Sequence, residues 1–154
     1  MTRFETSLPD PAATARLATR VAPLARIGDV VALRGPLGSG KTSFARAFIE
    51  ARAGRPLEVP SPTFTLVQTY ELPNGPVWHF DLYRLERPDD AIELGVDEAF
   101  ASAISLIEWP ERLGDLLPAD RLDVWLDFAG DGRRASLEAQ GSWHARLADM
   151  AAAA

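Results

Sequence analysis

The first third of the chain changes from helical to strand-like spacing of its apolar residues. Residues 15–24 carry apolar side chains at helical intervals after Asp10 and Pro11, a pair typical of a helix N-cap and first turn. Residues 30–33 form a short continuous apolar run, which indicates a strand covered on both faces. A second helix is expected over residues 41–53, ended by Gly54.

The middle of the chain predicts a β-hairpin followed by short helices. Strand-forming residues at 65–72 and 77–82 flank a Pro-Asn-Gly-Pro turn. Short helices are expected over residues 88–94, with a glycine behind, and over residues 96–103. These helices return the chain to the next buried strand.

The last third predicts one buried strand and an antiparallel pair. The apolar run at 104–107 leads directly into Glu108, after which a proline opens a helix to about residue 117. Residues 121–128 and 133–139 predict strands around a Gly-Asp-Gly turn, and Ser142 is expected to cap an amphipathic helix. The pattern predicts an α/β fold with a mostly parallel central sheet flanked by helices, a β-hairpin and an antiparallel C-terminal pair.

Length and composition favour one globular domain spanning residues 1–154. The chain is 47% hydrophobic and 25% charged, and no apolar run approaches the roughly 20 residues of a membrane span. The N-terminus does not resemble a signal peptide and the chain has no cysteine, so we expect a cytoplasmic protein without membrane contact. A net charge of −6 opposes unaided binding to nucleic-acid phosphates, so such a partner requires a second protein.

A glycine-rich segment between the first buried strand and its following helix fits the P-loop pattern. Residues 35–42 read Gly-Pro-Leu-Gly-Ser-Gly-Lys-Thr, and Lys41 is the only lysine among the 16 basic residues. Backbone amides and the helix N-terminus can surround a phosphate there, while a lysine reaches the β- and γ-phosphates. The residues expected to bind a nucleotide are Gly35, Leu37, Gly38, Ser39, Gly40, Lys41, Thr42 and Ser43.

Two carboxylates follow predicted strands and are candidates for holding Mg²⁺ or a water. Glu108 should project from the carboxyl end of a central strand beside the loop, and Asp81 ends the second strand of the hairpin. Each could instead be a solvated acid at a strand end. His79 lies two residues before Asp81, where a structural hydrogen bond is the commoner role, and no His or Cys cluster predicts zinc.

Five sequence blocks, in order along most of the chain, resemble the bacterial TsaE family. Besides the loop, the matching blocks are Ser-Pro-Thr-Phe-Thr-Leu at 61–66, His-Phe-Asp-Leu-Tyr-Arg-Leu at 79–85, Glu-Leu-Gly at 93–95 and Ile-Glu-Trp-Pro-Glu at 107–111. TsaE proteins are P-loop ATPases that act in making threonylcarbamoyladenosine (t6A) on tRNA. Ser39 stands where that family commonly has alanine, and the C-terminal quarter resembles it only weakly.

The resemblance implies a Mg²⁺-dependent ATPase that resets a complex of the proteins TsaD and TsaB, with tRNA contacted only through them. Thr42 and Glu108 would hold Mg²⁺, Asp81 would position the metal or the attacking water, and Lys41, Asp81 and Glu108 would be catalytic. Segments 61–65 and 82–85 would be switch segments that respond to the γ-phosphate. Trp109 resembles a position tied to activity, although the sequence alone allows a packing role.

Other functions remain open at this point. A small P-loop kinase acting on a metabolite or nucleoside is the main alternative, although the arginines at 84–87 and 133–134 are few and scattered for a lid. A GTP switch is disfavoured because no Asn-Lys dipeptide is present, and a binding module without catalysis is a further possibility. Arg84 could contact phosphate or a partner, or be a surface residue.

Two expectations concern the nucleotide more closely. Hydrolysis by the chain alone should be slow, because no arginine finger is obvious in the sequence. The start of the first helix near Asp10 and the late arginines Arg133 and Arg134 are expected to contact adenine, on the ground of their nearness to the loop.

Overall fold

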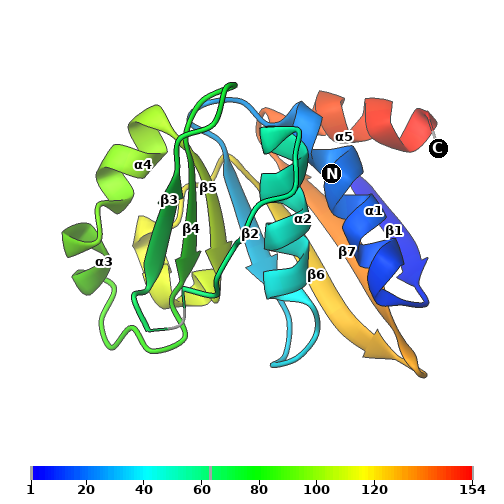
Figure 1. Cartoon of the computed structure of the whole chain (residues 1–154), viewed down its shortest axis with the longest axis horizontal. Helices are drawn as coiled ribbons and strands as arrows, with labels where there is room; N and C mark the ends of the chain where they lie inside the picture. The colour runs from blue at the N-terminus through cyan, green and yellow to red at the C-terminus, as the bar shows by residue number, and fades with distance from the viewer. Residues whose placement is uncertain (1, 63, 154) are drawn as a thin grey trace.

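Four parallel strands form the centre of a seven-stranded sheet in the order β1-β7-β6-β2-β5-β4-β3 (Figure 1). The computed structural model describes residues 2–62 and 64–153. The central strands are β6 (Arg121–Ala129), β2 (Val30–Arg34), β5 (Ile104–Glu108) and β4 (Val77–Asp81). Their carboxyl ends meet at one edge, the lower edge in Figure 1, and this edge carries the loop that leads into α2.

Antiparallel strands flank the parallel centre on both sides. Strand β3 (Val67–Tyr70) pairs with β4 as the predicted hairpin, and β7 (Gly132–Gln140) pairs with β6 as the predicted C-terminal pair. The edge strand β1 (Arg3–Leu8) pairs with β7. It was not predicted, because most of its residues are polar and it contains few apolar residues. In the described part of the chain three of the six strand pairings are parallel and all three lie at the centre, so the expected parallel centre is confirmed, while the flanking antiparallel strands make the whole sheet mixed.

Three α-helices and a short 3₁₀ turn cover one face of the sheet. They are α1 (Pro11–Val21), η1 (Ala22–Leu24), α2 (Lys41–Ala53) and α5 (Trp143–Ala152), and their apolar sides share one core. The predicted cap is confirmed, because the Asp10 carboxylate accepts a 2.8 Å hydrogen bond from the amide of Ala13. Gly54 ends α2 in a left-handed conformation, as predicted.

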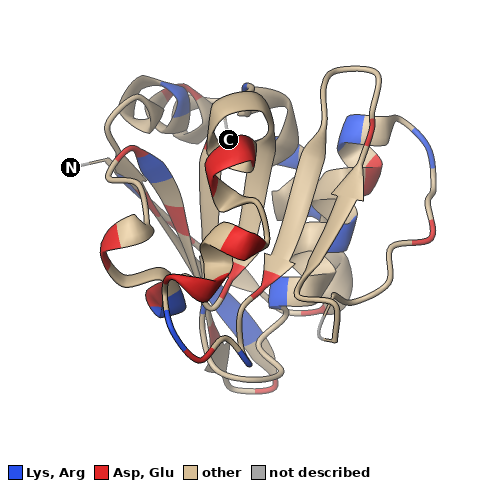
Figure 2. Cartoon of the chain, turned by 90° about the vertical axis from the view of Figure 1, so that its left-hand side faces the viewer, with Lys and Arg blue, Asp and Glu red and all other residues tan. Residues whose placement is uncertain are grey.

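The opposite face is covered by shorter elements. These are α3 (Asp90–Glu93), α4 (Val96–Ser102) and the 3₁₀ segment η2 (Pro110–Leu116), which pack on a second apolar cluster from β4 and β5. Figure 2 shows acidic residues gathered along α3 and α4. No helix in the described ranges has the length and apolar composition needed to cross a bilayer.

Ser142 is the N-cap residue of the last helix, as predicted, but it does not cap the helix through its side chain. Ser142 is helical, with φ −65° and ψ −12°, and its side chain makes no capping hydrogen bond. Its hydroxyl instead donates to the carboxylate of Asp120 at 2.9 Å, because the β6–β7 pair brings residue 120 beside the start of α5. The helix therefore begins with a tertiary contact.

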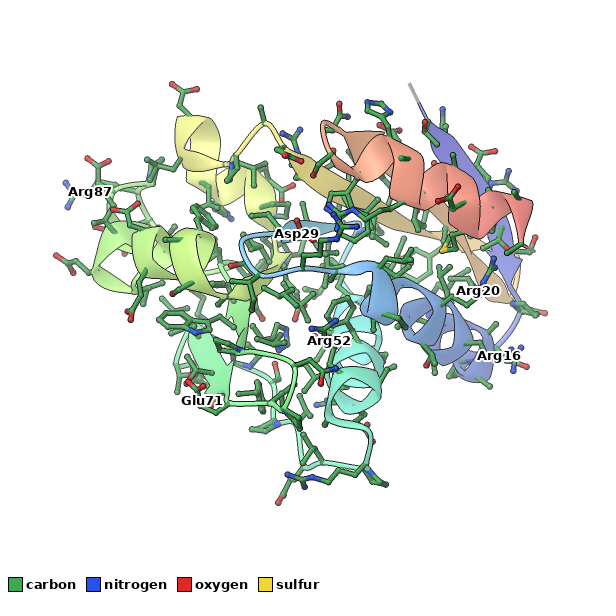
Figure 3. The ribbon with its side chains drawn as sticks, turned by 90° about the horizontal axis from the view of Figure 1, so that it is seen from above. Arg16, Arg20, Asp29, Arg52, Glu71 and Arg87 are labelled. Carbon is green, nitrogen blue, oxygen red and sulfur yellow. The ribbon has the colours of Figure 1, made fainter. Side chains whose placement is uncertain are left out.

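Two buried arginines join the helical layer to the loops at the upper edge, and Figure 3 labels one of them, Arg52 on α2, together with Asp29 in the loop before β2. Arg52 of α2 donates to the carbonyl oxygens of Ala22, Ala25 and Asn74 at 3.1–3.2 Å. Arg146 of α5 forms a 2.6 Å ion pair with Asp29, which precedes β2. These contacts anchor the start of β2 and the end of α2, the two elements that flank the glycine-rich loop.

Candidate functional site

The loop at residues 35–40 connects β2 to α2 at the carboxyl edge of the parallel strands (Figure 1). Gly35 has φ 140°, and a Cβ there would clash with the carbonyl oxygen of Leu126. Gly40 is left-handed, with φ 107°, and is the N-cap of α2. These positions require glycine, because only glycine adopts such angles without strain and leaves the backbone close to a ligand.

Lys41 is buried at the first position of α2. Its Nζ donates to the carbonyl oxygens of Gly35 at 2.7 Å and Pro36 at 3.0 Å, and lies 4.2 Å from the ring centroid of Trp109. Burial lowers the pKa of Lys41, while the carboxylates of Glu108, Asp81 and Glu111 act in the opposite direction. An ammonium held inside the loop in this way is positioned to attract a phosphate.

The Trp109 ring reaches Lys41 because its backbone is left-handed, with φ 60°. Such a conformation is costly for a large side chain and is found where a site needs it. The ring of Tyr83 also packs against the Trp109 ring, with the two ring centroids 5.0 Å apart. The structure thus places Trp109 at the loop rather than only in the core.

Glu108 and Asp81 end adjacent parallel strands in direct register. The hydroxyl of Thr42 donates to the Glu108 carboxylate, with distances of 2.9 Å to Oε1 and 3.0 Å to Oε2. Oδ1 of Asp81 accepts from the amide of Tyr83 at 3.1 Å. Both carboxylates are buried, so the strand ends bring two acids and a hydroxyl to one place, which matches the sequence expectation of their grouping.

His79 contacts the same carboxylate from the neighbouring strand. Its Nε2 lies 2.7 Å from Oε2 of Glu108, and the ring is fully buried. Since an ionised carboxylate only accepts, Nε2–H donates. The sequence favoured a structural role for His79. The signal that connects it to the site is its spacing, two residues before Asp81 and therefore on the same side of β4.

A cavity of about 430 Å³ opens beside the loop. Most of the residues selected from the sequence line it: Leu37, Gly38, Gly40, Lys41, Thr42, Ser43, Asp81 and Glu108. Tyr83, Arg84 and Trp109 complete the lining. Gly35 lies beneath the loop, where its carbonyl oxygen holds Lys41.

A second cavity of about 260 Å³ lies on the other side of the loop and shares Gly38, Gly40 and Ser43 with the first. The start of α1, Ser39 and the β6–β7 turn line it, the residues being Leu8, Pro9, Asp10, Pro11, Thr14, Asp131, Gly132 and Arg133. The side chain of Ser39 is buried there. The sequence placed the start of this helix, near Asp10, beside the loop, but it did not single out Thr14, which lies one turn later.

The two late arginines lie on different faces of β7. Arg133 donates to the carbonyl oxygen of Gly38 at 3.2 Å and stacks on Phe128. Arg134, which the sequence proposed for the nucleotide, instead pairs with Glu5 at 2.9 Å and lines a separate hollow on the open face of the sheet. Adjacent residues of a strand point to opposite faces, so only one of them reaches the loop.

The segment proposed as the first switch lies next to Asp81. Thr63 of this segment lies outside the described residues. The carbonyl oxygen of Leu66 accepts from the amide of Asp81 at 3.0 Å, and Phe64 is 82% exposed. Leu66 directly follows this segment, so the chain immediately after residues 61–65 is joined through the backbone to one of the two carboxylates.

The fold and site define a mixed α/β protein with a glycine-rich loop between a buried strand and a helix. A family model described as "Threonylcarbamoyl adenosine biosynthesis protein TsaE" matches residues 8–135. The chain belongs to this TsaE family.

Individual relatives agree over most of their length. The TsaE protein of Rickettsia bellii is 38% identical over 134 residues, covering 87% of this chain and 93% of the relative. The TsaE protein of Bacillus subtilis is 39% identical over 126 residues, covering 81% and 78%. The crystal structure of YdiB from Bacillus subtilis superposes with a TM-score of 0.83 at 30% identity, covering 99% of this chain and 95% of that one.

Proposed function

We propose that this protein binds and hydrolyses ATP with Mg²⁺ and acts in t6A modification of tRNA by resetting a TsaD–TsaB transferase complex. The observation that carries the proposal is the hydrogen bond from Thr42 to Glu108 beside the buried ammonium of Lys41. Membership of a family named for threonylcarbamoyl adenosine biosynthesis supports the pathway. It also favours this reading over a small P-loop kinase.

The triphosphate would occupy the 430 Å³ cavity. Loop amides and the N-terminus of α2 favour anions there, because the helix dipole and unpaired N–H groups point at the same place. Lys41 is positioned to exchange its two carbonyl contacts for β- and γ-phosphate oxygens. The glycine-rich loop thereby acts as a P-loop.

The oxygen donors at the cavity fit Mg²⁺. Thr42 and Glu108 already lie within hydrogen-bond distance of one another, and Asp81 lines the same cavity. The described residues hold no group of three or more His, Cys, Asp or Glu for a metal, which is consistent with an ion held by few side chains, phosphates and water. When bound, Mg²⁺ would neutralise charge on the phosphates.

In the proposed hydrolysis, a water oxygen bonds to the γ-phosphorus as the bond to the β–γ bridging oxygen breaks. The bond's electron pair stays on ADP, and the water proton leaves through phosphate or solvent. Glu108, held by Thr42 and His79, orients the water or metal, and Asp81 supports it from the adjacent strand. Positioning and electrostatics supply most of the rate enhancement in such reactions.

The adenosine would occupy the 260 Å³ cavity, which shares the loop with the phosphate cavity. The buried Thr14 and the guanidinium of Arg133 offer polar contacts at its walls. Adenine is preferred over guanine because the chain has no Asn-Lys dipeptide of the guanine-reading kind. Of the two arginines expected at this part of the site, Arg133 is kept in the proposal and Arg134, which pairs with Glu5, is not.

Transfer of the modification to tRNA would occur on the partners. The net charge of −6 and the acids along α3 and α4 (Figure 2) disfavour direct contact with RNA phosphates. We therefore propose that TsaD and TsaB contact the tRNA, and that nucleotide turnover in this chain acts on them.

The test is ATP turnover with Mg²⁺, measured with and without TsaD and TsaB. We expect slow turnover alone, stimulation by the partners, and no nucleotide binding by Lys41→Ala in calorimetry. An absence of heat with wild-type protein at millimolar ATP, or no binding or stimulation by the partners, would contradict the proposal. Transfer of labelled γ-phosphate to metabolites faster than to water would favour the kinase alternative.

A further inference from the structure

Arg84 lies at the rim of the phosphate cavity, three residues after Asp81. Its guanidinium carbon is 4.9 Å from the ring centroid of Phe64, in the segment at residues 61–66. Arg84 and Phe64 are both exposed. The pair therefore sits on the surface at the edge of the site.

The other arginines close to the loop are already engaged. Arg34 forms ion pairs with Asp123 and Glu111, and Arg133 donates to the carbonyl oxygen of Gly38. Arg84 forms no ion pair with any described residue, and its guanidinium stacks on the Phe64 ring. Among the described residues that line the cavity, Arg84 is the one guanidinium.

The charge of the cavity favours a second cation. Two carboxylates, Asp81 and Glu108, line it together with a single ammonium, that of Lys41. A triphosphate with one Mg²⁺ would add further net negative charge, and this charge spreads onto the γ-phosphoryl oxygens in the transition state. A planar guanidinium suits two of these oxygens at once, which an ammonium does not.

We propose that Arg84 is a catalytic residue that leaves the Phe64 ring and donates hydrogen bonds to the γ-phosphoryl oxygens during hydrolysis. This inference rests on the proposed ATPase function. As water oxygen bonds to the γ-phosphorus and the bridging oxygen departs with ADP, Arg84 stays protonated and stabilises the oxygens between them. It neither gives nor takes a proton, because a guanidinium in a protein stays protonated.

The Phe64 contact makes this arginine dependent on the segment at residues 61–66. An exposed cation–π contact is weak and readily exchanged for a charged ligand. Because the Leu66 carbonyl also holds the amide of Asp81, a displacement of this segment would move Phe64 and Asp81 together. Release of Arg84 would then coincide with rearrangement at the metal-binding carboxylate.

The test compares Arg84→Ala with Arg87→Ala, an exposed arginine three residues away that pairs with Asp90. Turnover is measured with TsaD and TsaB at saturating ATP, and the affinities for ADP and for ADP with aluminium fluoride are measured by calorimetry in the same complex. We expect Arg84→Ala to lower turnover and aluminium fluoride affinity by about 100-fold or more. The affinity for ADP should change by less than about threefold, because the arginine acts on the transferred group.

Arg84→Lys is expected to restore little of the loss, since an ammonium does not reproduce the planar fork. Phe64→Leu should raise the turnover of the chain alone about twofold to fivefold, because the contact holding Arg84 is removed. Unchanged or lower turnover in Phe64→Leu would overturn the holding role of the ring.

Three results separate this inference from the proposed function. Wild-type protein that fails to hydrolyse ATP overturns both. Wild-type turnover combined with an Arg84→Ala variant that behaves as Arg87→Ala overturns the inference alone. If Arg84→Ala in the presence of ADP weakens binding to TsaD and TsaB as much as it lowers turnover, Arg84 is a docking residue, and the inference is also overturned.

Discussion

Nε2 of His79 lies 2.7 Å from Oε2 of Glu108, and both side chains are buried between adjacent parallel strands. The same carboxylate accepts the hydroxyl of Thr42. Glu108 is thus fixed from two sides, by β4 and by α2. A carboxylate held in this way presents its oxygens to the cavity in one orientation, which is what binding and chemistry require of it.

Removing the imidazole should therefore affect turnover more than nucleotide affinity. We expect His79→Leu to lower kcat about 10-fold to 100-fold with little change in the Kd for ATP. His79→Gln should recover part of the loss, because its amide nitrogen can donate to Glu108 from a similar distance. Steady-state kinetics give kcat and calorimetry gives the Kd for ATP. A loss of kcat in His79→Gln as large as that in His79→Leu would contradict a positioning role.

Neutralising Glu108 should separate binding from hydrolysis. Glu108→Gln or Glu108→Ala is expected to lower turnover by about 100-fold or more while the Kd for ATP changes by only a few fold, since the loop and Lys41 hold the phosphates. Glu111→Gln is the control, because Glu111 is half-exposed and pairs with Arg34 instead. Parallel losses of affinity and turnover in Glu108→Gln would rule out the assigned role.

The two adjacent arginines of β7 provide a matched test of the adenosine cavity. Arg133→Ala should weaken ATP binding about 5-fold to 20-fold, because it removes a hydrogen bond to the loop and a wall of the cavity. Arg134→Ala should leave the affinity unchanged, since Arg134 pairs with Glu5 on the other face. Calorimetric titration with ATP decides the question, and a larger effect at Arg134 would place the adenosine elsewhere.

Stability should depend on the ion pair between Asp29 and Arg146. Asp29→Asn leaves a largely buried guanidinium without its charge partner, and we expect a loss of about 3 kcal/mol in the free energy of unfolding. Asp90→Asn, which breaks the exposed pair with Arg87, should cost about 0.5 kcal/mol or less. Denaturant titration of both variants measures the two losses in the free energy of unfolding. Losses of similar size would contradict the prediction.

Much of the site could be predicted from the sequence because its parts are local. The glycines at 35, 38 and 40 and the following Lys41 and Thr42 encode the backbone conformation of a single turn. Glu108 was identified because a buried apolar run ends at it, and the carboxyl end of a central strand is where such an acid is useful. These inferences need only the spacing of neighbouring residues, and the structure groups Gly38, Gly40, Lys41, Thr42 and Glu108 around one cavity.

The remaining features depend on pairings between distant segments. The register of β4 against β5 decides that His79 reaches Glu108, and the pairing of β1 with β7 adds an edge strand whose sequence is mostly polar. Because successive side chains of β7 point to opposite faces of the sheet, Arg133 points toward the loop and Arg134 points away from it. The amino-acid sequence alone specifies the turns and the buried strands of this protein. The face of the sheet on which each side chain lies is set only when strands far apart in the sequence form hydrogen bonds, because a shift of one residue in register moves every side chain of a strand to the opposite face.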